Sequence, residues 1–268
     1  MRKTINRLLN LLPFRWKGLS IDDSHRYWLI SPALLRGGQS IVSGYVNGQR
    51  VFDWLSVHVP LDLKSCVLDV GCGDGRVAAA FARPENNFTG RYCGFDIDRK
   101  RLSALIRLFQ GNERFNFVHA DIYHSYYNPG GTIPAESYRF PYADASFDLI
   151  WFNSIFTHLK LSVIAHNLRE AFRCLAPAGK VWATAYLLDE HGEPDDPPPD
   201  RRFETAYDQG FTATPDNPEG CVAYRLETIL GLAEDIGFAL EKHIPGYWRA
   251  PRHSLDQHEQ DVLVLVKP

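Results

Sequence analysis

Three carboxylates carry the clearest chemical signal in this sequence. Asp69, Asp96 and Asp121 each close a short apolar segment of the kind that forms a buried strand. In open parallel sheets, ligands bind in the crevice at the carboxyl ends of the strands. Carboxylates placed there accept hydrogen bonds from hydroxyl and amino groups and favour a positively charged ligand. We therefore predict an acidic binding crevice at this edge of a sheet.

A glycine-rich turn joins the first of these strands to an alanine-rich helix. Its glycines let the backbone turn sharply and let a ligand approach without meeting a Cβ; they are Gly71, Gly73 and Gly75. The dinucleotide fingerprint G-x-G-x-x-G does not fit, because its third glycine would fall on Arg76. Asp69 and Asp74 also disfavour a pyrophosphate, which such loops bind through amide donors. A glycine turn of some other α/β protein is the alternative.

Alternating strand and helix patterns must position these residues. The expected strands lie at residues 66–70, 91–95, 115–119, within 141–151, and at 180–188, 238–244 and 262–266, with helices at 99–109, 161–175 and 224–236. The first 63 residues are expected to form an N-terminal helical segment or cap, and residues 64–268 the main domain. Insertions are expected at residues 123–140, which are rich in tyrosine, and at 190–220, which are proline-rich, acidic and expected not to join the sheet.

The pattern Asp-x-Gly-x-Gly-x-Gly at residues 69–75 resembles motif I of the class I S-adenosylmethionine-dependent methyltransferases, with a type 11 or type 25-like domain of the bacterial small-molecule type. The resemblance runs from about residue 67 to residue 185. It implies an α/β, Rossmann-like, doubly wound sheet of seven strands, mostly parallel with an antiparallel last strand. It also implies the cofactor S-adenosyl-L-methionine, which carries an ammonium and a sulfonium group and no phosphate.

The same resemblance assigns the cofactor contacts. The glycine turn would hold the methionine end, the acid after the second strand the ribose hydroxyls, and the acid after the third strand the adenine amino group. Asp96 also lies roughly 20 residues beyond the turn, the interval typical of a ribose-binding acid, whereas Asp98 fits a helix N-cap. The expected cofactor-binding residues are Asp69, Gly71, Cys72, Gly73, Gly75, Asp96, Ile97, Asp121, Ile122, Asn153 and Ser154.

Two residues are candidates for catalysis. His158 follows the fourth strand closely and is the candidate general base, with packing or capping at a helix start as the alternative. Tyr186 leaves the fifth strand toward the same crevice. The expected substrate-pocket residues are Tyr127, Thr157, Asp189, Tyr247 and Trp248. The H-x-D-x-x-H spacing at residues 119–124 matches no standard ligand set, so we expect no metal.

The sequence favours a small-molecule acceptor, such as a hydroxyl or amine of a metabolite, sugar or natural-product intermediate. Residues 153–156 read Asn-Ser-Ile-Phe, where methyltransferases of nucleic acid base amines show Asn/Asp-Pro-Pro-aromatic, and the net charge of −3 gives no attraction to phosphates. A non-catalytic S-adenosylmethionine-binding or partner protein, and a methyltransferase acting on a macromolecule, are the alternatives. The sequence does not indicate the oligomeric state.

The basic, leucine-rich stretch at residues 1–17 is expected either to pack on the domain or to make weak contact with a membrane surface. The chain contains five cysteines and no C-x-x-C pair, which indicates reduced thiols and a cytoplasmic location. No apolar run reaches the length of a membrane span.

Overall fold

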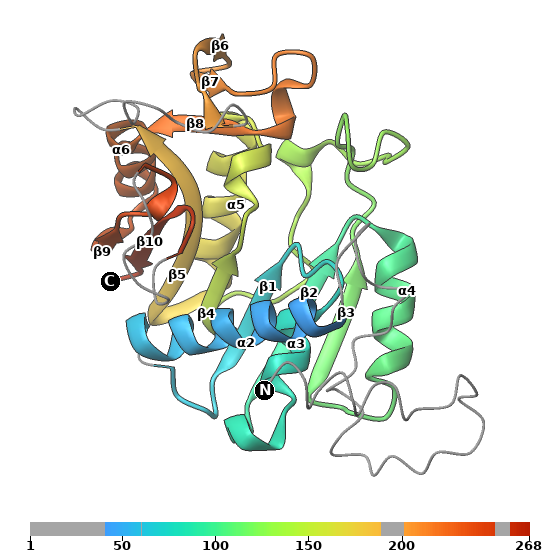
Figure 1. The fold of residues 1–268 in the computed structure, drawn as a ribbon. Helices are drawn as coiled ribbons and strands as arrows, with labels where there is room; N and C mark the ends of the chain where they lie inside the picture. Colours follow the sequence, from blue (N-terminus) through green and yellow to red (C-terminus); the bar gives the residue numbers. More distant parts are fainter. Residues whose placement is uncertain (1–40, 60, 189–200, 250–257) are drawn as a thin grey trace.

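The computed structural model describes residues 41–59, 61–188, 201–249 and 258–268, and a parallel sheet forms the centre of this part (Figure 1). The five parallel strands follow the spatial order β3-β2-β1-β4-β5. They are β1 (Cys66–Val70), β2 (Arg91–Asp96), β3 (Phe115–His119), β4 (Phe147–Phe152) and β5 (Leu175–Leu188). β1 and β4 are almost entirely buried, and apart from one aspartate in each their residues are apolar.

Two C-terminal strands complete the sheet beside β5. β10 (Asp261–Val266) runs antiparallel to β5 on one side and to β9 (Ala239–Ile244) on the other. The predicted α/β, doubly wound sheet with an antiparallel last strand is therefore confirmed.

Two predictions were wrong: that the sheet has seven strands, and that the insertion at residues 190–220 does not join the sheet. The described sheet has ten strands because β8 (Val222–Arg225) pairs in parallel with the end of β5 and carries β7 (Gly210–Thr212) and β6 (Thr205–Tyr207). The prolines that disfavour pairing are concentrated at residues 194–199, whereas residues 203–212 are rich in threonine and aromatic residues, which favour strands. Residues 189–200 lie outside the described part, as do residues 1–40 with the basic stretch.

Helices cover both faces of the sheet (Figure 1). The main helices are α2 (Ile41–His58), α3 (Arg76–Phe81), α4 (Arg99–Leu108), α5 (Leu161–Cys174) and α6 (Leu226–Ile236). Apolar side chains of α5 and α6 pack with Leu68 and Ile150 on one face, and those of α2, α3 and α4 pack with Val67 and Trp151 on the other. Within the described residues, every helix is too short or too polar to cross a membrane.

Short 3-10 turns connect several of these elements. They are η3 (Pro84–Asn86), η4 (Ala135–Ser137), η5 (Phe156–His158), η7 (Pro218–Gly220) and η8 (Tyr247–Arg249). All five cysteines are free thiols, and only Cys66 is more than slightly accessible.

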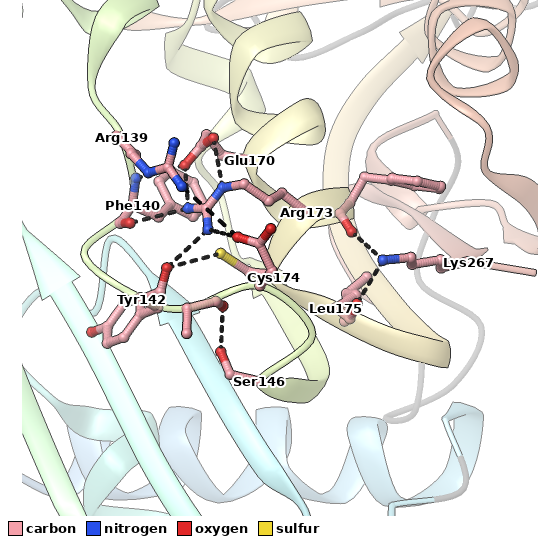
Figure 2. Close-up of polar contacts among 12 residues, drawn as sticks. Arg139, Phe140, Tyr142, Ser146, Glu170, Arg173, Cys174, Leu175 and Lys267 are labelled. Carbon is pink, nitrogen blue, oxygen red and sulfur yellow. Dashed lines mark hydrogen bonds and ion pairs between the residues drawn. The ribbon is translucent and has the colours of Figure 1, made fainter.

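Arg173 of α5 anchors the segment that leads from the tyrosine-rich insertion into β4 (Figure 2). Its guanidinium donates to the Glu170 carboxylate at 2.6 Å and to the main-chain oxygens of Phe140 and Tyr142 at 3.1 and 2.9 Å. At the end of the same helix, the Lys267 ammonium donates to two main-chain oxygens, as cations at helix C-termini commonly do. The insertion is therefore held in a fixed position relative to the sheet.

Candidate active site

A cavity of about 250 Å³ opens at the carboxyl ends of β1, β2 and β4. This is the edge of the sheet at which the acidic crevice was predicted. Nine of the predicted site residues line it: Gly71, Gly73, Asp96, Ile97, Ile122, Tyr127, Asn153, Ser154 and His158. The structure thus brings both the predicted cofactor loop and the predicted base to one cavity.

The glycine turn forms one wall of the cavity. All three of its glycines have left-handed backbone angles, with φ of 76°, 54° and 74° at Gly71, Gly73 and Gly75. A Cβ on Gly71 would lie 2.3 Å from the Ile155 side chain, and one on Gly75 would lie 2.2 Å from Leu105. At Gly73 the nearest atom would be 3.9 Å away, so the space beside this residue stays open to a ligand.

Asp96 ties this turn to the end of β2. Its Oδ2 accepts a hydrogen bond from the Gly73 nitrogen at 2.7 Å, and its Oδ1 accepts one from the Asp98 nitrogen at 2.7 Å. Burial raises the pKa of the Asp96 carboxyl, although both backbone donors oppose the shift. Each carboxylate oxygen keeps further acceptor capacity for ligand hydroxyls. As predicted, Asp98 is the N-cap of α4, and it accepts from the Arg101 nitrogen at 3.0 Å.

Three predicted cofactor residues, within or next to the glycine turn, do not line the cavity: Asp69, Cys72 and Gly75. The Asp69 carboxylate is buried and accepts a hydrogen bond from the Tyr92 hydroxyl. Burial raises the Asp69 pKa to about 7. Cys72 is also buried and faces Gly94, as Gly75 faces Leu105. The structure places these residues as support for the turn.

His158 has a defined hydrogen-bonding state. Its Nδ1 lies 3.1 Å from the main-chain oxygen of Glu219, which can only accept, so Nδ1 carries the proton. Nε2 is then the basic nitrogen, and it lies 3.5 Å from the Tyr127 hydroxyl at the cavity. The His158 main-chain oxygen accepts from His124 Nε2 at 3.0 Å. A neutral imidazole with Nε2 unprotonated can take a proton from a bound ligand.

Asp121 binds its own loop. Its carboxylate accepts from the Thr132 hydroxyl at 2.6 Å, which lowers the Asp121 pKa, and its side chain does not line the cavity. The neighbouring Ile122 does. After β4, the Ser154 nitrogen donates to the Thr184 hydroxyl at 2.7 Å, and the Asn153 Oδ1 is buried with no hydrogen-bond partner among the described residues.

The remaining predicted residues are not brought to the cavity. Tyr186 and Trp248 are buried in a separate cluster with Phe203, and their rings meet edge to face at 5.4 Å. Tyr186 is enclosed because β5 continues beyond it and pairs with β8, and the Trp248 indole nitrogen donates to Asp261 at 2.8 Å. Two others, Thr157 and Tyr247, also do not line the cavity. Asp189 lies outside the described residues.

Sequence reasoning missed several residues of the cavity wall. Asp74 pairs with Arg76 at 3.0 Å, and Asp98 pairs with Arg101 at 3.3 Å. The Asp98 and Arg101 spacing of three residues at a helix start was a usable signal. Glu219 does not line the cavity but contacts His158 from 61 positions further along the chain, and no local pattern in the sequence indicated it.

The residues around the cavity fit an adenosyl ligand with a positive charge. The turn is open at Gly73, buried carboxylates surround it, and apolar side chains of Ile97 and Ile122 lie beside Asp96 in the cavity wall. Together with the sheet order and the antiparallel β10, these features define the class I S-adenosylmethionine-dependent methyltransferases, whose cofactor is S-adenosylmethionine.

Comparison with known families gives the same result. Residues 68–183 match the family model described as "Methyltransferase domain". One relative is 27-O-demethylrifamycin SV methyltransferase of Amycolatopsis mediterranei, 27% identical over 61% of this chain and 51% of that protein. Another is methyltransferase GfsG of Streptomyces halstedii, 30% identical over 50% and 42%. The chain spans about half the length of these curated relatives.

Solved structures share the fold at low sequence identity. A SAM-dependent methyltransferase of Methanosarcina mazei has a TM-score of 0.54 and 16% identity, covering 79% of this chain and 96% of that one. The [4+2]-cyclase SpnF has a TM-score of 0.54 and 19% identity, covering 82% and 80%. Because one of these two proteins is named a cyclase, the fold alone does not specify methyl transfer. The activity depends on the residues of the site.

Proposed function

We propose that this chain transfers a methyl group from S-adenosylmethionine to a hydroxyl group of a small molecule. The observation that carries the proposal is one cavity lined both by the Gly73 turn with Asp96 and by His158 with Nε2 as its basic nitrogen. Cofactor and acceptor can therefore meet in a single space.

The first part of the proposal concerns cofactor binding. Asp96 would accept hydrogen bonds from the two ribose hydroxyls through acceptor capacity that its backbone partners leave over. Ile97 and Ile122 would pack against the adenine ring, and the open side of Gly73 would admit the methionine end. Asp69 would act only by supporting the turn through Tyr92.

The second part concerns proton transfer. The bound cofactor supplies a strongly activated methyl group, so the protein has chiefly to hold the acceptor in line and exclude water. His158 Nε2 would take the proton that the acceptor hydroxyl loses when the methyl group passes from the sulfonium sulfur to its oxygen, with S-adenosylhomocysteine as the leaving group. A hydroxyl needs such a base more than a neutral amine does.

The third part concerns the acceptor. One relative is named for methylation of 27-O-demethylrifamycin SV, which favours an oxygen acceptor on a natural product. Tyr123 lines the cavity and exposes 50% of its surface. Tyr126 exposes 61%, and its ring packs edge to face at 4.9 Å on Tyr127, which also lines the cavity. Such exposed rings can stack against the apolar body of an acceptor whose hydroxyl enters the cavity.

The test is a transfer assay with methyl-labelled S-adenosylmethionine and paired acceptors, namely 27-O-demethylrifamycin SV and other hydroxylated natural products, and analogues that carry an amine at the same position. We expect label in the hydroxyl compounds, at an oxygen located by NMR, and loss of transfer in His158→Gln. Transfer to the amines alone would contradict the proposal. Label entering only protein or RNA fractions would favour a macromolecular acceptor, and cofactor binding without any transfer would favour a binding protein.

A further inference from the structure

We propose that Glu219 is a positioning residue for His158, and that the inserted segment at residues 201–220 is thereby a working part of the active site. The inference rests on the proposed role of His158 as the base. Glu219 would act twice, because its main-chain oxygen fixes the tautomer of the imidazole and its carboxylate fixes the place of that main chain.

The main-chain oxygen of Glu219 determines the tautomer of His158. The Glu219 main-chain oxygen lies 3.1 Å from His158 Nδ1 and can only accept a hydrogen bond. It therefore stabilises the form with the proton on Nδ1 and the lone pair on Nε2. The Tyr127 ring packs edge to face on the imidazole at 5.2 Å and restricts its rotation. The reverse tautomer would direct an N–H toward the acceptor and could not take its proton.

The second step is the rigidity of the turn that presents this oxygen. η7 is built by threonine hydroxyls of the same segment. Thr212 donates to the Pro218 main-chain oxygen at 2.8 Å, and Thr214 donates to that of Asn217 at 2.8 Å. The Gly220 nitrogen closes the turn by donating to the same Asn217 oxygen at 2.7 Å. These hydrogen bonds within residues 212–220 fix the position of the Glu219 main-chain oxygen.

The third step is the carboxylate, which links the turn to a different loop. Its Oε2 accepts from the Ser125 hydroxyl, and its Oε1 accepts from the Tyr207 hydroxyl at 3.3 Å. Burial raises the Tyr207 pKa to about 12, so this hydroxyl stays protonated and keeps donating. Ser125 follows His124, which itself donates to the His158 main-chain oxygen at 3.0 Å.

These contacts close a ring around the base. His124 holds the backbone of His158, Glu219 holds its side chain, and Ser125 joins the two holding groups. Without the Glu219 carboxylate, the turn and the tyrosine-rich loop lose their direct side-chain link. The imidazole would then sample both tautomers while the cofactor half of the cavity stays intact.

The experiment uses the full chain labelled with ¹⁵N and long-range ¹H–¹⁵N NMR spectra of its histidine rings, which distinguish the two tautomers. The His158 signals are assigned by their absence in His158→Gln. We expect the Nδ1–H form in the unaltered chain. Glu219→Ala keeps the main-chain oxygen but removes both side-chain anchors of the turn, Ser125 and Tyr207. Its contact with His158 Nδ1 should weaken by about one net hydrogen bond, so the ratio of Nδ1–H to Nε2–H should fall about tenfold. Glu219→Gln should retain most of the ratio because its amide oxygen still accepts.

Two controls keep the result decisive. Glu227→Ala removes an exposed glutamate from the first turn of α6 and should leave the ratio unchanged. If Glu219→Ala does not fold, the double variant Ser125→Ala with Tyr207→Phe removes both carboxylate partners and should lower the ratio in the same direction. An Nε2–H tautomer in the unaltered chain, or an unchanged ratio in the variant that folds, would overturn the proposal.

The result is separable from the proposed function. Calorimetry with S-adenosylhomocysteine should give the same affinity in Glu219→Ala as in the unaltered chain, because Glu219 does not line the cavity. If S-adenosylhomocysteine does not bind even the unaltered chain, the proposed function is wrong. The tautomer ratio still tests the role of Glu219, because its measurement does not require a bound cofactor.

Discussion

The backbone nitrogen of Gly73 lies 2.7 Å from Oδ2 of Asp96 and donates a hydrogen bond to it. Because the other oxygen of this carboxylate accepts from the Asp98 nitrogen, one side chain joins the glycine turn of β1 to the start of α4. The cofactor site is therefore organised around the end of β2. Asp69, the acid within the motif itself, faces away toward Tyr92.

Gly73→Ala should block the cofactor without unfolding the chain. Among the described residues, a Cβ at this position meets no atom closer than 3.9 Å, so it would occupy space left for the ligand. We expect calorimetry to show at least about a tenfold loss of affinity for S-adenosylhomocysteine, since about 1.4 kcal/mol corresponds to a factor of ten. Gly111→Ala is the matched control, because Gly111 also has a positive φ, of 87°, and lies in open space away from the cavity. Equal affinity in both variants would contradict this reading of the turn.

His158→Gln should lower kcat by about 10²–10⁴-fold, the usual contribution of a positioned general base. Cofactor affinity should not change, because the imidazole is assigned to the acceptor. Steady-state kinetics with the acceptor identified by the transfer assay measures the effect. Tyr186→Phe is the comparison, since the Tyr186 hydroxyl donates to Glu259 in the separate cluster and should leave kcat within about twofold. A larger loss in Tyr186→Phe than in His158→Gln would reverse the assignment.

Asp69→Asn should stabilise the protein at alkaline pH. The native pKa of Asp69 is raised to about 7 from 3.8, so between these values the native state holds a proton that the unfolded state releases. The stabilising contribution is full below about pH 4 and is lost as the pH rises through 7. Relative to the unaltered chain, the variant should therefore gain roughly 3 kcal/mol in free energy of unfolding between about pH 4 and pH 8. Urea unfolding at several pH values measures this gain, with the exposed Asp235→Asn as control. A flat difference across this range would refute the prediction.

Arg173→Met should destabilise the fold by about 3 kcal/mol, because it leaves two main-chain oxygens without this donor and removes the cation paired with Glu170 (Figure 2). Within the described part of the chain, Glu170 then keeps only the hydrogen bond from the Phe140 nitrogen. The charged groups of this pair are only 16% and 13% exposed. Arg139→Met offers a control in the same region: Arg139 is 73% exposed, pairs with Asp144 at 3.8 Å and should contribute less than about 1 kcal/mol. Thermal and urea unfolding measure the loss of stability in the two variants. Equal losses would contradict the anchoring role of Arg173.

Local patterns in the sequence predicted most of the strands and helices, and the family resemblance predicted the doubly wound sheet and much of the cavity wall. The positions of Asp96 and Asp98 follow from a strand end and a helix start, which depend on neighbouring residues alone. The burial of Tyr186 could not be predicted, because it depends on β8 pairing with β5 from 37 positions away at Ala223. Glu219 was missed for the same reason. Asp69 was misplaced because its motif specifies where the chain turns and not which way the carboxylate faces.

The most direct test of the site is calorimetric titration of S-adenosylhomocysteine into the unaltered chain, Asp96→Ala and Asp69→Asn. We predict binding to the unaltered chain, about a hundredfold weaker binding in Asp96→Ala, because two hydrogen bonds to a charged acceptor are lost, and nearly unchanged binding in Asp69→Asn. Thermal unfolding of each variant shows that it remains folded. Absence of binding to the unaltered chain, or unchanged affinity in folded Asp96→Ala, would contradict the account.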